Sequence, residues 1–223
     1  MAKLGFTLLL HTVVINKVEI MQISSNIMKM FRCIVIILVI IPLFLVLGEE
    51  KISLCPAVVD REQWGASKAL SIEPLAKNPA PIVVVHHADC QPCLSLLSCT
   101  KKVQNIQHYH ISTKRWNDIG YNFLIGGEGT IFEGRGWGIT GAHAKGWNNR
   151  SIGICLIGNF QEKSPPSSQL LALEALIACG VKNENIAKNY SLIGHRQATR
   201  TACPGDILFS IVKNMSHFDA NPQ

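Results

Sequence analysis

The chain has 223 residues, which is enough for one substantial domain with a buried core or at most two small ones. Hydrophobic residues make up 48% of it, and the formal net charge is +6 without any basic cluster. This mild positive bias argues against a nucleic-acid partner, because such partners are held by clustered Lys and Arg side chains.

An apolar block near the amino terminus predicts a secretory signal peptide. Residues 33–47 carry no charge, Lys29 and Arg32 precede them, and Gly48 follows as a small residue suited to cleavage. The block is shorter than the ~20 residues that a membrane-spanning helix needs, and Pro42 interrupts it. A membrane anchor is therefore the second interpretation, and it applies only if the segment stays uncleaved.

We expect residues 1–48 to be an extension plus the signal peptide, and residues 49–223 to form the single domain of a secreted, extracellular protein. Residues 1–30 precede the point where a signal peptide normally begins, and an alternative start would account for them. Removal of residues 1–48 takes four basic residues and one acidic residue, which leaves a formal charge of +3.

The cysteines indicate an oxidising compartment, in which most of them would pair. An odd number of them follows residue 48: Cys55, Cys90, Cys93, Cys99, Cys155, Cys179 and Cys203. Cys93 and Cys99 are six positions apart and can close a small disulfide ring, while Cys179 is a plausible partner for Cys55. The odd count leaves at least one thiol free, and a metal ligand is one use for it.

The first predicted strand leads to two histidines. Residues 82–87 form a continuous apolar run too short for a helix, which is typical of a buried central strand, and the run ends in His86 and His87. Side chains alternate between the faces of a strand, so only one of the two can belong to a given site. Residues 99–113 show a helical pattern with Val103, Ile106 and His110 on the inner face and Lys101, Lys102 and Gln107 away from it.

The rest of the chain alternates strands, turns and helices. The expected strands are 121–126, 130–133, 151–158 and 190–193, and the expected helices are 165–180, stopped by Gly180, and 205–213. Cys155 falls in a core strand and is expected to be an inert buried thiol, whereas Cys90 in the loop after residue 87 stays unassigned. Strands interleaved with helices and hairpins predict one mixed α/β domain.

A stretch near the carboxyl terminus carries a candidate pair of metal ligands. His195 and Cys203 are eight positions apart, Thr201 lies two residues before the Cys, and a Pro-Gly pair follows it. Imidazole nitrogen and thiolate sulfur are ligands that zinc prefers. An isolated pair of this kind is more often a surface histidine and half of a disulfide. His86 is the third candidate ligand, and spacing alone leaves open whether the three form one site.

Several motifs occur together and in order over residues 55–218. They lie at residues 85–87, 116–126, 133–137, 141–143, 151–154, 195–197 and 203–205. Taken together they resemble the peptidoglycan recognition proteins, a family related to bacterial and phage zinc amidases. The resemblance implies a central mixed β-sheet flanked by about three helices, with a groove for the glycan-peptide.

The resemblance also implies a zinc centre and an enzyme. In amidase members the first His of the pair is a zinc ligand, which corresponds to His86, and His195 and Cys203 supply the other two. Tyr121 matches the catalytic tyrosine, and Thr201 matches the residue that helps at the reacting carbonyl. Members that only bind usually lack the Cys that this chain has, so we expect a zinc-dependent N-acetylmuramoyl-L-alanine amidase.

The bond implied by the family is the amide between N-acetylmuramic acid and the L-alanine of the stem peptide, cleaved in innate immunity. The alternative is a non-catalytic pattern-recognition receptor that binds peptidoglycan and signals. In either case His87, His110 and His143 match groove residues that contact the muropeptide in family complexes.

Two further positions bear on the type of peptidoglycan. Arg135 matches the Arg that binds the extra carboxylate of meso-diaminopimelic acid. The planar guanidinium group has the geometry that suits a carboxylate. Trp116 matches the Trp of a Gly-Trp pair in members that prefer diaminopimelate, but Arg115 stands where Gly is expected. The resemblance thus favours diaminopimelate-type peptidoglycan as the partner, and Arg115 is the departure from its pattern.

Overall fold

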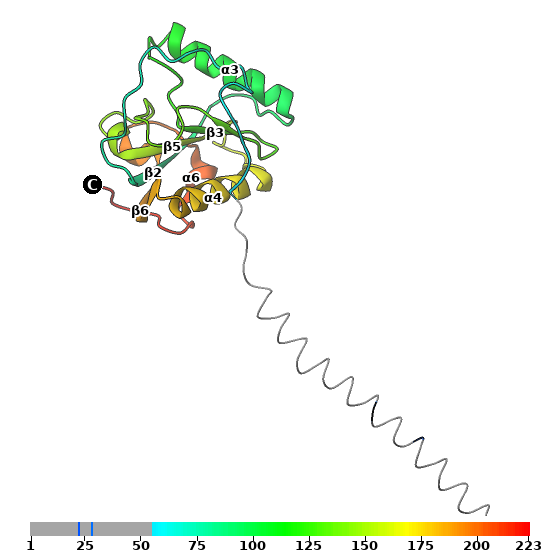
Figure 1. The fold of residues 1–223 in the computed structure, drawn as a ribbon. Helices are drawn as coiled ribbons and strands as arrows, with labels where there is room; N and C mark the ends of the chain where they lie inside the picture. Colours follow the sequence, from blue (N-terminus) through cyan, green and yellow to red (C-terminus); the bar gives the residue numbers. More distant parts are fainter. Residues whose placement is uncertain (1–21, 23–27, 29–54) are drawn as a thin grey trace, which may run out of the picture. The chain divides into compact units, whose positions relative to one another are not determined.

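The computed structural model describes residues 22, 28 and 55–223, and every element named below lies in residues 55–223. One sheet has the strand order β1-β4-β3-β5-β2-β6, and Figure 1 labels its strands β3, β5, β2 and β6. Its strands are β1 Val58–Val59, β2 Ala80–His87, β3 Phe123–Ile125, β4 Ile131–Glu133, β5 Ser151–Leu156 and β6 Ile186–Gly194. The hairpin β3–β4 is antiparallel and the other pairings are parallel, so the predicted mixed sheet is confirmed.

The predicted signal segment, residues 33–47, and the boundary after residue 48 lie outside the described residues. Within the part of the chain that the structure describes, no helix combines the length and the apolar composition needed to cross a membrane.

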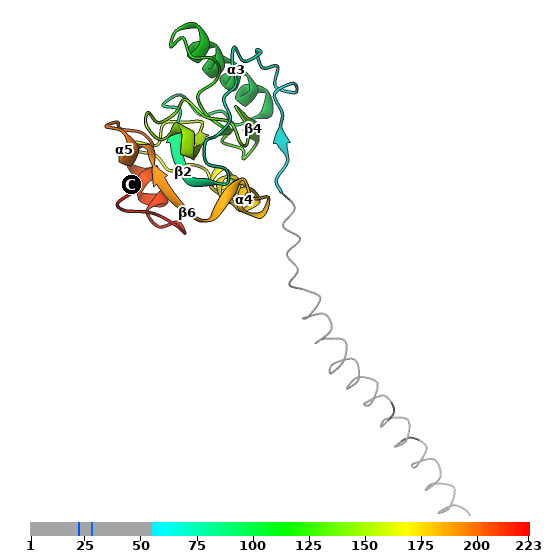
Figure 2. The same ribbon diagram turned by 60° about the vertical axis from the view of Figure 1, so that its left-hand side comes forward.

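Three main helices cover the two faces of the sheet (Figures 1 and 2). They are α3 Leu96–Ser112, α4 Ser167–Lys182 and α6 Asp206–Val212. The same part of the chain also contains two short helical turns, η2 Asn148–Arg150 and α5 His195–Ala198. Apolar side chains of α4 and α6 pack with Val83 and Val85 on one face, whereas those of α3 pack with Leu124 and Cys155 on the other. The sheet is therefore buried on both sides, which explains why β2 is a continuous apolar run.

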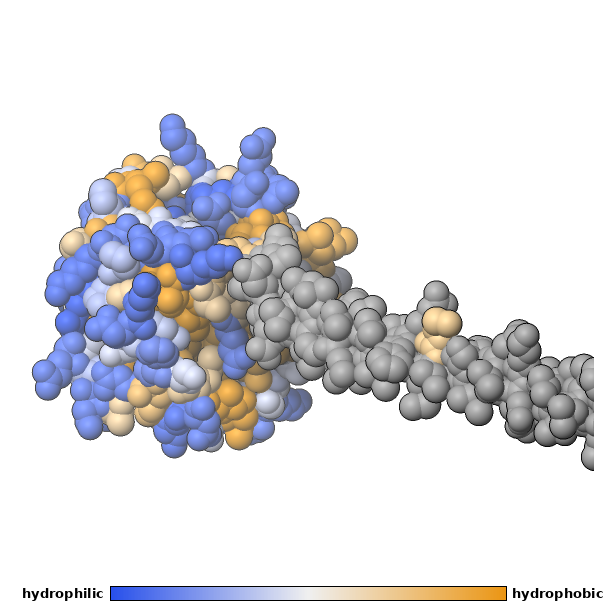
Figure 3. All heavy atoms as spheres, turned by 60° about the horizontal axis from the view of Figure 1, so that its bottom comes forward, coloured by the Kyte–Doolittle hydropathy of each residue, from blue (hydrophilic) through white to orange (hydrophobic). Residues whose placement is uncertain are grey.

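One face of the domain is mainly polar. On the face turned forward in Figure 3, hydrophilic residues surround smaller groups of hydrophobic ones. This division is expected when the large apolar side chains are used in the two cores, because burial of apolar area is the main favourable contribution to folding.

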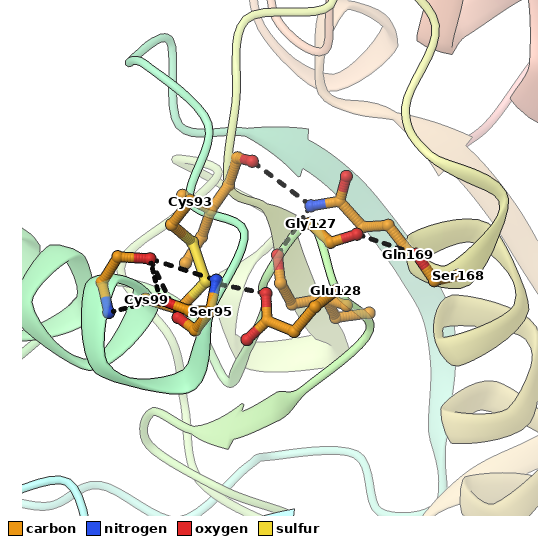
Figure 4. The surroundings of a disulfide bond; sticks show 10 residues. Cys93, Ser95, Cys99, Gly127, Glu128, Ser168 and Gln169 are labelled. Carbon is orange, nitrogen blue, oxygen red and sulfur yellow. Dashed lines mark hydrogen bonds between the residues drawn. A yellow bond between two sulfur atoms is a disulfide. The ribbon is translucent and has the colours of Figure 1, made fainter.

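Two disulfides tie the periphery to this frame. Cys55 is joined to Cys179 of α4, and Cys93 is joined to Cys99 in the first turns of α3. Around the second bond, the Gly127 N–H donates to the Cys93 carbonyl at 3.1 Å and the Ser168 hydroxyl donates to the Gly127 carbonyl at 2.8 Å (Figure 4). The start of α3, the β3–β4 turn and the start of α4 are thus linked in series.

Helix α3 corrects one expectation about its faces. Gln107, predicted to face away from the core, is 2% exposed. Its amide donates to the Asp118 carboxylate at 2.7 Å and to the Ser67 carbonyl at 3.0 Å, and its oxygen accepts from the Ser67 N–H at 2.8 Å. A polar side chain with all of these partners can be buried at little cost, so the apolar pattern alone misplaced it.

Gly180 is not the end of α4, contrary to the sequence prediction. The helix continues to Lys182, with Asn183 as its C-cap. A Cβ atom at residue 180 would lie 2.6 Å from Ile186 and 2.7 Å from Trp137, so this glycine permits close packing on β6. Strand β6 is also longer than predicted, because Ala80 of β2 extends its pairing back to Ile186.

Candidate metal centre

The parallel register of β2 and β6 brings two distant histidines together. Val85 of β2 is paired with Gly194 of β6, so the next residues, His86 and His195, are neighbours across the strands. Their ring centroids are 4.3 Å apart. His86 is 1% exposed, whereas His195 is partly exposed at the start of α5. The carboxyl ends of parallel strands thus create the site, although 109 positions separate the two residues along the chain.

Cys203 completes the group from the turn before α6. Its Sγ lies 3.8 Å from His86 Nδ1 and accepts a hydrogen bond from the His87 backbone N–H at 3.3 Å. The Cys203 backbone N–H in turn donates to Thr201 Oγ1 at 3.2 Å, which shapes the turn. The ligand atoms of His86, His195 and Cys203 all lie within 4.8 Å of one another.

This donor set fits a zinc ion. Zinc bonds of about 2.0 Å to nitrogen and about 2.3 Å to sulfur would place tetrahedral ligands roughly 3.5 Å apart, close to the spacing of these atoms. His195 Nδ1 is buried and has no hydrogen-bond partner within the described residues. A buried polar atom without a partner is costly in a folded protein, and a metal ion bound to this nitrogen would satisfy it.

The protonation states also suit a cation. Burial lowers the pKa of His86 well below its ordinary value, with the neighbouring His143 and His195 adding to the effect, and it lowers the pKa of His195 to about 4. Both imidazoles are therefore neutral near pH 7 and can offer a lone pair. Burial raises the pKa of the Cys203 thiol to about 12, so the thiolate needs a cation beside it.

Tyr121 and Thr201 flank the three ligands. The Tyr121 ring centroid is 5.2 Å from that of His86. Burial, followed by the neighbouring Cys155 and Cys203, raises the pKa of this phenol well above its ordinary range, which keeps its proton in place. Thr201 is exposed, and its hydroxyl hydrogen is not used in accepting from Cys203.

His143 lies deeper than a simple groove contact. It is 7% exposed, and its Nδ1 is 3.0 Å from His86 Nε2. Its Nε2 is 3.5 Å from the hydroxyl of Ser151, the first residue of β5. Burial lowers its pKa to about 3, with His195 as the next cause, so this ring is neutral as well.

The other two predicted histidines sit on either side of the centre. His87 points away from the three ligands, and its Nδ1 accepts from the Phe160 backbone N–H at 3.3 Å. His110, at the end of α3, accepts from the Gly120 N–H at 3.0 Å and lies 4.6 Å from Trp116 and 5.6 Å from Tyr121 between ring centroids. Burial lowers the pKa of both imidazoles, that of His110 to about 4.

Arg135 is held by the backbone around it. Its Nε donates to the Ile119 carbonyl at 2.7 Å and its Nη1 to the Thr140 carbonyl at 2.8 Å, which leaves Nη2 without a hydrogen bond in the described part of the chain. Arg115 has φ +60°, a left-handed conformation that glycine adopts without strain. A glycine at this position would adopt the same φ without strain.

A hollow adjoins the centre on the side of His87. It has a volume of about 820 Å³ and lies between the loop after β2 and the loop after β5, with Asp89, Cys90 and Phe160 among its lining residues. Phe160 connects this hollow to His87, because its backbone N–H donates to the His87 ring.

Two residues next to the ligands, Ser151 and Cys155, were not predicted from the sequence to belong to the site. Both lie on β5, and Cys155 is paired with His86 in the register of β2 and β5. The signal was present in the alternation of β5, because Ser151, Gly153 and Cys155 share the face that meets His86 while the isoleucines between them face the other core.

The fold and this His-His-Cys site define the class of protein. A family model described as N-acetylmuramoyl-L-alanine amidase matches residues 76–206. The chain belongs to the N-acetylmuramoyl-L-alanine amidase family and, within it, is similar to the peptidoglycan recognition proteins.

Individual relatives and solved structures give the extent of this similarity. Peptidoglycan-recognition protein 2 of Holotrichia diomphalia is 40% identical over 168 residues, which are 75% of this chain and 89% of the relative. Human N-acetylmuramoyl-L-alanine amidase is 37% identical over 169 residues, 74% of this chain but 29% of that longer protein. Among solved structures, peptidoglycan recognition protein-LE in complex with tracheal cytotoxin, a monomeric diaminopimelic acid-type peptidoglycan, has a TM-score of 0.71 and 36% identity, covering 73% of this chain and 96% of that one.

Proposed function

We propose that this protein is a secreted, zinc-dependent amidase. It binds bacterial peptidoglycan and hydrolyses the amide between N-acetylmuramic acid and the L-alanine of the stem peptide. The observation that carries the proposal is the convergence of His86, His195 and Cys203, whose ligand atoms lie within 4.8 Å of one another. Membership of a family named for this reaction supports it.

His86, His195 and Cys203 would hold the ion. When bound, zinc supplies Lewis-acid polarisation of the scissile carbonyl and a lower pKa for the attacking water. Three protein ligands are typical of a catalytic centre, whereas structural zinc sites have four.

Tyr121 and Thr201 provide the remaining polar groups at the reacting bond. The Tyr121 hydroxyl keeps its proton and can donate it as a hydrogen bond to the oxyanion that develops on the carbonyl. Thr201 can donate a hydrogen bond from the turn between α5 and α6, because the Cys203 N–H already orients its hydroxyl oxygen.

The substrate is proposed to be diaminopimelate-type peptidoglycan. Arg135 has a guanidinium nitrogen, Nη2, without a hydrogen bond in the described residues, and it can bind the extra carboxylate. A similar solved protein is bound to a muropeptide of this type. His110 and Trp116 lie together near Tyr121, where an aromatic wall would suit the stem peptide.

Secretion is proposed from the signal segment and the thiol chemistry. The two disulfides, Cys55–Cys179 and Cys93–Cys99, suit an oxidising extracellular compartment and would be reduced in the cytosol.

The test is cleavage of purified diaminopimelate-type peptidoglycan, with added zinc and with a chelator, followed by mass analysis of the products. We expect zinc-dependent release of free stem peptides that begin with L-alanine. Cys203→Ser should release none, whereas Cys90→Ser, which changes a free thiol outside the ligand group, should behave as the unmodified protein. Tight binding without release in either condition would contradict the amidase and indicate a receptor.

A further inference from the structure

We propose that His143 and Ser151 are positioning residues that fix the orientation and tautomer of His86 for metal binding. This inference rests on the proposed function, since it concerns the same metal centre. It assigns His143 a task in addition to the groove contact that the resemblance implies.

The direction of the hydrogen bonds follows from the chain of partners. The Ser151 hydroxyl is 2.7 Å from the carbonyl oxygen of Trp147, which can only accept, so the hydroxyl hydrogen points there. The hydrogen bond between Ser151 Oγ and His143 Nε2, which are 3.5 Å apart, can then run only from the nitrogen to the oxygen. A neutral imidazole carries one hydrogen, so His143 Nδ1 is an acceptor.

The same reasoning continues to His86. Its Nε2 lies 3.0 Å from His143 Nδ1 and must donate its hydrogen to that acceptor. His86 Nδ1 is then left without hydrogen, and it is this nitrogen that faces Cys203 Sγ at 3.8 Å. The hydrogen bonds from Ser151 through His143 to His86 therefore leave the lone pair of His86 Nδ1 facing the other ligands. Fixing a ligating histidine in this way is the usual role of its hydrogen-bond partner outside the ligand set.

The fold contains a niche for the His143 ring. Cβ atoms added at Gly141 or at Gly153 would run into this ring, so two glycines make room for it on opposite elements. The backbone N–H groups of His143 and Ala144 both donate to Asn148 Oδ1, at 2.9 and 2.7 Å. Ring and backbone are thus both constrained, as a positioning role requires.

The first test is zinc affinity, measured without substrate by competition with a chromophoric chelator. His143→Leu removes the acceptor, and we expect zinc to bind about 10–100-fold more weakly. His143→Asn places an amide oxygen near the former Nδ1 and should recover most of that affinity. Gly153→Ala keeps the histidine but displaces its ring, so it should also weaken binding.

The second test reads the tautomers directly by ¹⁵N NMR of the metal-free protein. We expect hydrogen on Nε2 of both His86 and His143, and Ser151→Ala should release His143 from this single tautomer. Hydrogen on His86 Nδ1 would overturn the proposal, as would unchanged zinc affinity in a folded His143→Leu variant. Failure of the unmodified protein to bind zinc would instead contradict the proposed function.

Discussion

The protonation of Cys203 is expected to control how zinc binding depends on pH. Burial raises the pKa of this thiol to about 12, whereas burial lowers the pKa of His195 to about 4 and that of His86 well below its ordinary value. Between pH 6 and 8 the thiol is protonated and both imidazoles are neutral. Zinc binding must therefore displace one proton, from Cys203, and none from the histidines.

One displaced proton sets the magnitude. The apparent zinc affinity should rise about tenfold per pH unit, or about a hundredfold from pH 6 to pH 8. Competition titrations with a chromophoric chelator at a series of pH values measure this slope. Calorimetry in buffers of different ionisation enthalpy gives the number of protons independently.

Two variants and two outcomes check this reasoning. Cys203→Ser should lose the slope together with most of the affinity, while Cys90→Ser should keep both. A slope of two or three near pH 6 would mean that the histidines titrate at ordinary pKa values in the metal-free protein. A slope near zero would mean that Cys203 does not bind as a thiolate, which would refute the ligand assignment.

Four substitutions test separate features. Cys203→Ser should abolish cleavage but leave peptidoglycan binding largely intact in a pull-down with insoluble peptidoglycan, and loss of binding would show that the thiol also holds the groove together. Arg115→Gly should raise the free energy of unfolding by about 0.5–1 kcal/mol in urea titrations, because φ +60° is strained for arginine. The control Arg115→Ala keeps the strain and should leave the free energy of unfolding unchanged. Arg135→Ala should lower affinity for diaminopimelate-type muropeptides by roughly 10–100-fold relative to lysine-type ones in calorimetry, and an equal loss for both types would contradict carboxylate recognition. Cys179→Ser removes the Cys55–Cys179 disulfide and should lower the free energy of unfolding by about 4–5 kcal/mol, since the closed loop spans 124 positions. An unchanged denaturation midpoint would contradict this stabilising role of the disulfide.

Local patterns in the sequence were sufficient for the existence of the main elements, though not for all of their ends. The apolar run of β2, the Gly-rich turn between β3 and β4 and the periodic face of α4 each reflect short-range periodicity, and the structure has all three elements. The single mixed α/β domain followed from their alternation. The separate roles of His86, His195 and Cys203 came from the family resemblance, and they stay a prediction until a metal is measured.

Long-range pairing decided what the local pattern could not. The register that sets Val85 against Gly194 joins segments more than 100 positions apart, and no periodicity within either segment encodes it. Gln107 turned inward because Asp118 and Ser67 satisfy its amide, and Gly180 lies inside α4 because β6 and Trp137 approach it closely.

His143 shows most clearly the difference between what the sequence specifies and what the tertiary structure decides. The sequence marks it only as one of several histidines, and the resemblance places it in a groove. Its link to His86 exists because β2 and β5 pair in parallel and because Gly141 and Gly153 leave space for its ring. Residue identity thus specifies which chemistry is available, whereas tertiary packing determines which atoms face one another, since hydrogen bonds depend on distances that only the folded chain sets.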